Sequence, residues 1–132
     1  MLTDTSVVIE SPNDDANTLS RRLEGWYRNY SLDHLSARTD AIHSSAPVFL
    51  PKCTVKVRKM KRQWGNCSRN GEIKYSLALM QYPAPCVDYV IAHELSHLLH
   101  FDHSRGFYSV LEQLCPDWHD RKIELETFGP NL

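Results

Sequence analysis

The sequence is marked first by what it lacks, and each absence argues against a class of protein. Its four cysteines include no C-x-x-C pair, which argues against a zinc ribbon and a dithiol redox centre. No apolar run approaches the 18 residues that a membrane-spanning helix needs. The chain does not open on a basic segment followed by an apolar one, as a secretory signal would. These absences predict a cytoplasmic globular protein whose thiols stay reduced and pack as small apolar groups.

A large net charge is also absent, but the charges are unevenly spread. The formal net charge is −1, so the chain as a whole gives no electrostatic reason to expect a polyanionic partner. The first 18 residues carry no lysine or arginine and four acidic side chains: Asp4, Glu10, Asp14 and Asp15. Such a segment has little apolar surface to bury, so we predict a mobile acidic tail over residues 1–17 and one domain over residues 18–132.

The opposite bias occurs in the middle of the chain. Six of the fifteen basic residues lie within eleven positions: Lys52, Lys56, Arg58, Lys59, Lys61 and Arg62. A basic strand of this kind can attract nucleic acid or an acidic substrate. Because the bias is confined to one segment of a nearly neutral chain, the sequence favours a solvated strand face, with nucleic-acid binding as an alternative.

Hydrophobic periodicity predicts an α+β fold. Thr18 is a suitable N-cap for a helix that ends at the Ser-Ser-Ala-Pro stretch of residues 44–47. Residues 54–62 and 72–79 alternate apolar and polar side chains, as half-buried strands do. The turn residues between them favour a long-looped antiparallel hairpin. We therefore expect a short antiparallel sheet packed against an active-site helix and backing helices.

Three further helices are expected in the second half of the chain. The segment that begins near Pro83 carries apolar residues at helical spacing up to Leu98. Ser104 is a suitable N-cap for the next helix, which should end before the proline at position 116. A last helix would contact the core through Trp118 and Leu125. Aromatic and leucine stripes of this kind usually belong to the core.

The stretch with the most specific chemistry is H-E-L-S-H at residues 93–97. Two histidines four apart on a helix differ by about 40° around its axis and about 6 Å along it, so His93 and His97 face a common point. Glu94 would lie close enough to a zinc-bound water to take its proton without being a ligand. His103 can supply a third imidazole from beyond the helix end. The spacing therefore predicts one zinc ion held by His93, His97 and His103.

The surroundings of the motif strengthen this interpretation. A bare H-E-x-x-H pattern would occur in roughly 2 of 100 shuffled chains of this composition, so it is weak evidence alone. Here the apolar stripe of the same helix places both histidines beside the core, where cleft-lining residues belong. His100 would lie roughly 10 Å along the helix from His93, too far to share an ion, so it is expected at the cleft rim or in solvent.

Three further motifs accompany this helix: Q-W-G-N-C-S at residues 63–68, H-S-x-x-F-Y at residues 103–108 and P-D-W at residues 116–118. With the D-Y-V-I-A-H-E-L-S-H run, the chain resembles the YgjP-like zinc metallopeptidase family and, more distantly, the SprT-like and WLM-type minimal zincins. The resemblance implies a short sheet beside an active-site helix with a backing helix. It also implies a metallopeptidase that hydrolyses peptide bonds with a zinc-activated water, with Glu94 as general base and the three histidines as ligands.

Two alternatives remain open on the sequence alone. The first is a zinc-dependent hydrolase of nucleotides or other phosphoanhydrides, in which the basic strand would bind phosphate. The second is a non-catalytic, zinc-stabilised module that binds nucleic acid through Lys56 to Arg62 and Trp64. Glu94 argues against the second, because a structural zinc site needs no base and normally fills all four positions with side chains. The favoured partner is a peptide or protein substrate, with no membrane and no assigned oligomeric state.

Overall fold

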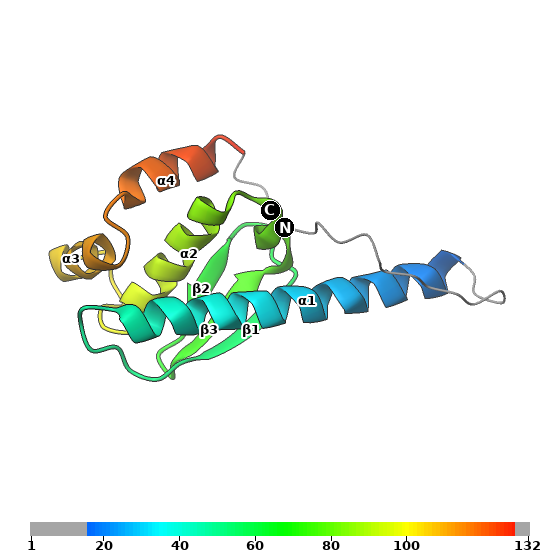
Figure 1. The fold of residues 1–132 in the computed structure, drawn as a ribbon, viewed down its shortest axis with the longest axis horizontal. Helices are drawn as coiled ribbons and strands as arrows, with labels where there is room; N and C mark the ends of the chain where they lie inside the picture. The colour runs from blue at the N-terminus through cyan, green and yellow to red at the C-terminus, as the bar shows by residue number, and fades with distance from the viewer. Residues whose placement is uncertain (1–15, 129–132) are drawn as a thin grey trace.

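The computed structural model describes residues 16–128, and within them four helices and a three-stranded sheet form an α+β fold (Figure 1). The elements are, in order, α1 (Ala16–Ser45), β1 (Thr54–Arg58), β2 (Gly65–Cys67), β3 (Glu72–Ser76), the 3₁₀ helix η1 (Leu77–Gln81), α2 (Ala84–His97), α3 (Arg105–Leu114) and α4 (Trp118–Glu126). The predicted fold class is confirmed. The predicted acidic tail lies outside the described residues, except for positions 16 and 17, which belong to α1.

The topology of the sheet differs from the prediction. The strand order is β1-β3-β2, with β3 in the centre. β1 runs parallel to β3, so the predicted antiparallel hairpin between these two segments is wrong and the sheet is mixed. The hairpin is instead formed by β2 and β3, whose tight turn contains Gly71 at φ +85°, a value that favours glycine. Residues 59–64 carry the chain from β1 past the end of β3 to the opposite edge of the sheet.

Three helix and strand boundaries also depart from the prediction. The first predicted strand, over residues 54–62, ends at Arg58. α1 begins at Ala16, so Thr18 lies inside its first turn instead of capping it. The second predicted strand stops at Ser76 because the Ser76 hydroxyl accepts a hydrogen bond from the Ala78 amide (3.2 Å) and starts η1. The predicted end of α1 near residues 44–47 is confirmed, since the helix ends at Ser45.

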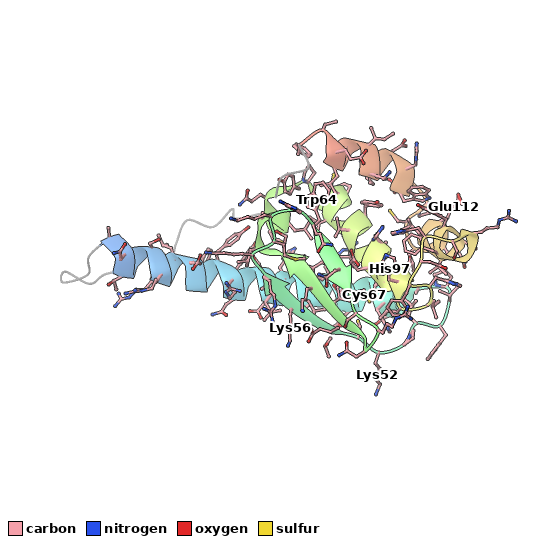
Figure 2. All side chains as sticks on the ribbon, turned by 180° about the vertical axis from the view of Figure 1, so that it is seen from behind. Lys52, Lys56, Trp64, Cys67, His97 and Glu112 are labelled. Atoms are coloured by element: carbon pink, nitrogen blue, oxygen red, sulfur yellow. The ribbon has the colours of Figure 1, made fainter. Side chains whose placement is uncertain are left out.

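Helices cover one face of the sheet. α1 packs mainly against β1 and α2 against β2 (Figure 1), while no helix of residues 16–128 lies on the opposite face, which is seen in Figure 2. On the covered face Ile73 and Tyr75 are completely buried, and the Tyr75 hydroxyl is hydrogen-bonded to Thr39 of α1 (3.0 Å). α3 and α4 pack on α2. The active-site helix predicted from the sequence is therefore held between the sheet and the two C-terminal helices.

Of the helices between residues 16 and 128, none combines the length and the apolar character that crossing a membrane requires. The four cysteines are free thiols, and each is buried or half-buried.

Candidate metal centre

Two elements bring three imidazoles together. α2 carries His93 and His97 one turn apart, and His103 comes from the connection between α2 and α3. One ligand nitrogen from each ring lies within 4.8 Å of the corresponding nitrogens of the other two. α2 ends at His97, with Leu98 as its C-cap, and the turn that follows directs the chain back so that residue 103 reaches the helix. Within the described residues, this is the one group of three side chains arranged to hold a metal ion.

A buried aromatic ring supports the three imidazoles. The centroid of the Phe107 ring lies 5.0 Å from that of His93, 4.5 Å from that of His97 and 4.9 Å from that of His103. Phe107 is completely buried in α3, whose N-cap Ser104 accepts a hydrogen bond from the Phe107 amide as predicted. The sequence identified Phe107 only as a core residue. Its contacts with all three rings give it a second role, since it limits how far each ring can turn.

The orientation of the His97 ring is fixed by the backbone. Its Nδ1 lies 3.0 Å from the carbonyl oxygen of His100, so Nδ1 carries the proton and donates it to that carbonyl. Nε2 is then free to bind a cation, which is the arrangement found in metal-ligating histidines. Burial lowers the pKa of His97, which favours the neutral imidazole that a metal requires.

His100 contributes this carbonyl and not its ring. The imidazole does not belong to the three-histidine group. It lies against Gly106, where an added Cβ would come within 2.6 Å of the ring. The sequence correctly separates His100 from the other three histidines, although its ring is half-buried at a helix junction. The hydrogen bond between the His100 carbonyl and the His97 ring could not be predicted from the sequence pattern.

Glu94 lies beside this group and is almost completely buried, with 4% of its surface exposed. Its Oε2 is 3.4 Å from Nδ1 of His93. β2 passes close to the carboxylate at Gly65, where an added Cβ would lie 3.3 Å from Oε2 and 3.0 Å from the carbonyl oxygen of Lys74. The missing side chain at residue 65 therefore lets the edge strand approach Glu94, which gives a physical reason for the glycine in the W-G-N-C segment.

A cavity of about 210 Å³ opens next to Glu94. Its apolar walls come from three parts of the chain: Trp64 before β2, Tyr89 and Val90 of α2, and Leu125 of α4. The indole Nε1–H of Trp64 is buried and has no hydrogen-bond partner among the described residues. We call this space the Glu94 cavity. It offers a mainly apolar surface beside the buried carboxylate.

Cys67, at the end of β2, does not add a ligand. Burial, assisted by the nearby Glu94 charge, raises the pKa of its thiol to about 12. The thiol is therefore protonated near neutral pH, which argues against nucleophilic attack, and Cys67 does not belong to the three-histidine group.

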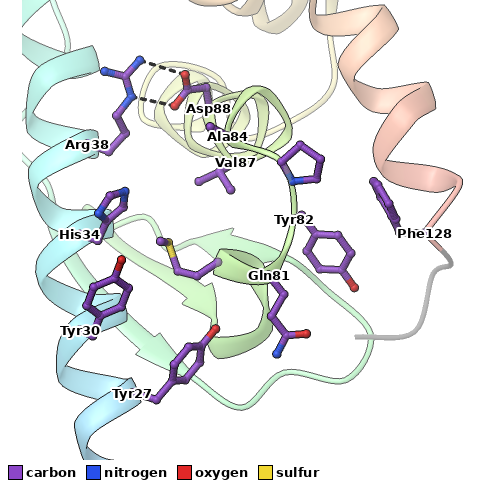
Figure 3. Close-up of a pocket in the computed structure, with 12 residues that line it drawn as sticks. Tyr27, Tyr30, His34, Arg38, Gln81, Tyr82, Ala84, Val87, Asp88 and Phe128 are labelled. Atoms are coloured by element: carbon purple, nitrogen blue, oxygen red, sulfur yellow. Dashed lines mark hydrogen bonds and ion pairs between the residues drawn. The ribbon is translucent and has the colours of Figure 1, made fainter. Parts of the chain in front are cut away.

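A larger cavity, of about 800 Å³, lies between α1, η1 and α2 (Figure 3). Aromatic side chains line it, among them Tyr27, Tyr30 and Tyr82. At one end Arg38 of α1 makes a two-pronged ion pair with Asp88 of α2, with distances of 2.8 and 2.9 Å (Figure 3). None of the three clustered histidines lines this cavity, so its size does not identify it as the centre of the chemistry.

Comparisons with known proteins give a family and a related fold. A family model described as YgjP-like, metallopeptidase domain, matches residues 1–128. The metallopeptidase zymogen of Pyrococcus abyssi abylysin has a similar structure, with a TM-score of 0.57 and 22% sequence identity. That match covers 74% of this chain and 92% of the other, and at this identity it shows a shared fold. No curated protein matches the chain.

Proposed function

The chain belongs to the YgjP-like metallopeptidase family, and we propose that it is a zinc-dependent peptidase in which His93, His97 and His103 hold the ion and Glu94 is the general base. One observation carries the proposal: three imidazoles converge next to a buried carboxylate at the wall of a cavity. Three ligands fit a catalytic zinc ion, which keeps one position open, better than a structural one, which normally has four.

The donor set fits the metal in kind and nearly in position. Neutral imidazole nitrogens suit zinc and bind it at about 2.0–2.1 Å, so two nitrogens on one tetrahedral ion lie about 3.4 Å apart. The present maximum of 4.8 Å requires small side-chain rotations to close the site. The fixed His97 ring provides a reference about which the His93 and His103 rings can adjust. Other first-row ions accept the same ligands, so the donor set favours zinc without excluding them.

The residues of the chain divide the work of hydrolysis. Zinc bound here would supply a Lewis acid and lower the pKa of a coordinated water to about 7. The Glu94 carboxylate then takes a proton from the attacking water and delivers it to the leaving amine. Burial between α2 and β2 restricts the movement of this carboxylate and so keeps it beside the three imidazoles.

The Glu94 cavity is the proposed place for the substrate side chain nearest the scissile bond. Its volume of about 210 Å³ equals that of about seven water molecules at roughly 30 Å³ each, enough for one bulky apolar side chain. Transfer of such a side chain from water is favourable because Tyr89, Val90 and Leu125 are apolar walls.

The experiment combines metal analysis with digestion of a peptide library. The purified protein is depleted with a chelator, assayed, reloaded with zinc and assayed again. We expect about one zinc ion per chain and cleavage that is lost on depletion and restored by zinc. Zinc-loaded protein that cuts no peptide in a library of all side-chain classes, yet hydrolyses nucleotides, would contradict the proposal and favour the phosphoanhydride alternative.

A further inference from the structure

The basic residues of the chain are concentrated in the part that forms the sheet. Between residues 41 and 87 there are eight lysines and arginines and a single acidic residue, Glu72. The remainder of the chain carries seven basic and fifteen acidic residues. The nearly neutral total therefore conceals a separation of charge: a positive sheet region and a negative remainder. Such a separation produces a local potential that the net charge does not reveal.

These cations lie on the uncovered face of the sheet and on the segment that leaves β1. On β1 the alternate residues Thr54, Lys56 and Arg58 are exposed, and Lys56 is paired in register with Lys74 of β3. Figure 2 shows Lys52 and Lys56 on the side of the sheet that no helix covers. We call the following residues together the cationic face: Lys52, Lys56, Arg58, Lys59, Lys61, Arg62 and Lys74.

Only part of this charge is neutralised within the molecule. Glu72 serves two lysines, with distances of 2.9 Å to Lys56 and 3.5 Å to Lys74. Lys59 is 2.5 Å from Glu24 of α1. Arg58, Lys61 and Arg62 are exposed and make no ion pair with any carboxylate of the described residues. An excess of positive charge therefore remains on a surface that is accessible to solvent.

The unpaired cations lead directly to the proposed active site. Residues 59–64 connect β1 to β2, and they end at Trp64, which lines the Glu94 cavity. Gly65 then passes the Glu94 carboxylate. A peptide whose side chain occupies the Glu94 cavity would thus have one flank close to Arg62, Lys61 and Arg58. Ser76 is in register with Arg58 on one side, and its amide donates to the Trp64 carbonyl (2.9 Å) on the other, so the backbones of Arg58 and Trp64 lie about two strand spacings, roughly 10 Å, apart. Exposed charges separated by about a Debye length of 8–10 Å still interact in physiological salt.

We propose that the cationic face binds an acidic segment of the peptide substrate, a few residues from the bond that is cut. This inference rests on the proposed peptidase function and names its substrate class: peptides or proteins with a run of aspartate and glutamate beside an apolar residue. The apolar residue occupies the Glu94 cavity, and the acidic run lies along Arg58, Lys61 and Arg62. Charge complementarity of this kind raises the rate of encounter and selects the orientation of the substrate.

An acidic peptide fits this surface better than nucleic acid does. Single-stranded nucleic acid is usually bound by several exposed aromatic rings interleaved with cations. Of the three aromatic rings of Phe, Trp and Tyr in residues 41–76, only Phe49 is exposed, since Trp64 is half-buried and Tyr75 is completely buried. A long polyanion would also extend past the cationic face to the rest of the molecule, where acidic residues exceed basic ones. A short acidic segment meets only the positive surface.

The test measures peptide binding in the absence of cleavage. Zinc-loaded Glu94→Gln protein is titrated with two labelled peptides that share one apolar residue and differ only in a flank of four glutamates or four serines. We expect the acidic peptide to bind about tenfold more tightly, with an affinity that falls as salt is raised. Adding Arg58→Glu and Arg62→Glu should abolish that difference. Arg21→Glu with Arg22→Glu, at the start of α1, changes the net charge equally and should preserve it.

Each outcome has a defined meaning. Equal binding of the two peptides, or equal losses in the two double-arginine variants, would overturn the proposal. An oligonucleotide of matched charge that displaces the acidic peptide and binds more tightly would assign the face to nucleic acid instead. Cleavage of both peptides by the wild type at equal rates would remove the substrate class and leave the peptidase intact. Selective binding of the acidic peptide without any cleavage by the wild type would retain the face and contradict the peptidase.

Discussion

Helix α2 lines two cavities that differ in size and in chemistry. The cavity shared with α1 and η1 is about 800 Å³ in volume, has aromatic walls and contains an ion pair whose two charges neutralise each other. The Glu94 cavity is about 210 Å³ in volume, yet a buried carboxylate and a histidine of the three-imidazole group line it. Volume alone would select the first as the active site. The convergence of reactive groups instead identifies the Glu94 cavity as the active site. This assignment can be tested by comparing a substitution near the three imidazoles with a matched substitution elsewhere in the chain.

The largest difference is expected between two histidines. His97→Ala removes a ligand whose ring is fixed by the His100 carbonyl, so zinc should be lost and turnover should fall to background. His34→Ala, in the larger cavity, should retain both, because His34 is exposed and its ring only stacks on Tyr30. Measuring the zinc content and peptide turnover of the two variants tests which of the two cavities adjoins the metal centre. A zinc-free His34→Ala protein would show that the two cavities are not independent.

The next difference is between two carboxylates on the same helix. Glu94→Gln should retain zinc and slow turnover by about 10²–10⁴, because the amide cannot take a proton from the attacking water. Asp88→Asn lies nearly two turns earlier, in the larger cavity, and should keep normal turnover. Both variants preserve side-chain size. Undiminished turnover in zinc-loaded Glu94→Gln protein would exclude Glu94 as the general base.

A smaller effect is expected from two glycines. At Gly65 an added Cβ would crowd the Lys74 carbonyl at 3.0 Å and Glu94 at 3.3 Å, so Gly65→Ala should displace the carboxylate and lower turnover about tenfold. At Gly25, within α1, no atom lies within 4 Å of an added Cβ. Gly25→Ala should raise the free energy of unfolding by about 0.5–1 kcal/mol and leave turnover unchanged. Turnover and thermal melting of both proteins provide the comparison.

The features of the site that could be predicted from the sequence are those that depend on local helix geometry. The H-E-x-x-H spacing depends only on helix geometry, so the juxtaposition of His93 and His97 could be predicted before any tertiary structure was known. Ser104 marks the start of α3 through a local capping preference in the same way. The contribution of Phe107 could not be predicted, because it arises only when α3 packs across α2 and brings one ring against three imidazoles.

The sheet shows why the rest was missed. Alternation of apolar and polar residues identified the strand segments but contains no information on the partner or direction of each strand. The three-residue strand β2 is too short to show alternation, and its insertion beside β3 converts the expected hairpin into a parallel pair. The approach of Gly65 to Glu94 follows from that topology. The glycine after Trp64 indicates that the backbone can approach another group closely at this position. Which group it approaches, here Glu94, depends on the tertiary structure.

The smallest effect is expected from the ion pair of the larger cavity. Arg38→Met removes the guanidinium from Asp88 but keeps a long apolar side chain at the same position of α1, so mainly the charge interaction is lost. Because both side chains are substantially exposed, at 47% and 32%, the free energy of unfolding should fall by only about 0.5 kcal/mol and the melting temperature by about 2 °C. Zinc content and turnover should not change. If turnover fell as well, with zinc retained, the position of α2 at Asp88 would control Glu94 two turns away, and the larger cavity would be part of the catalytic apparatus.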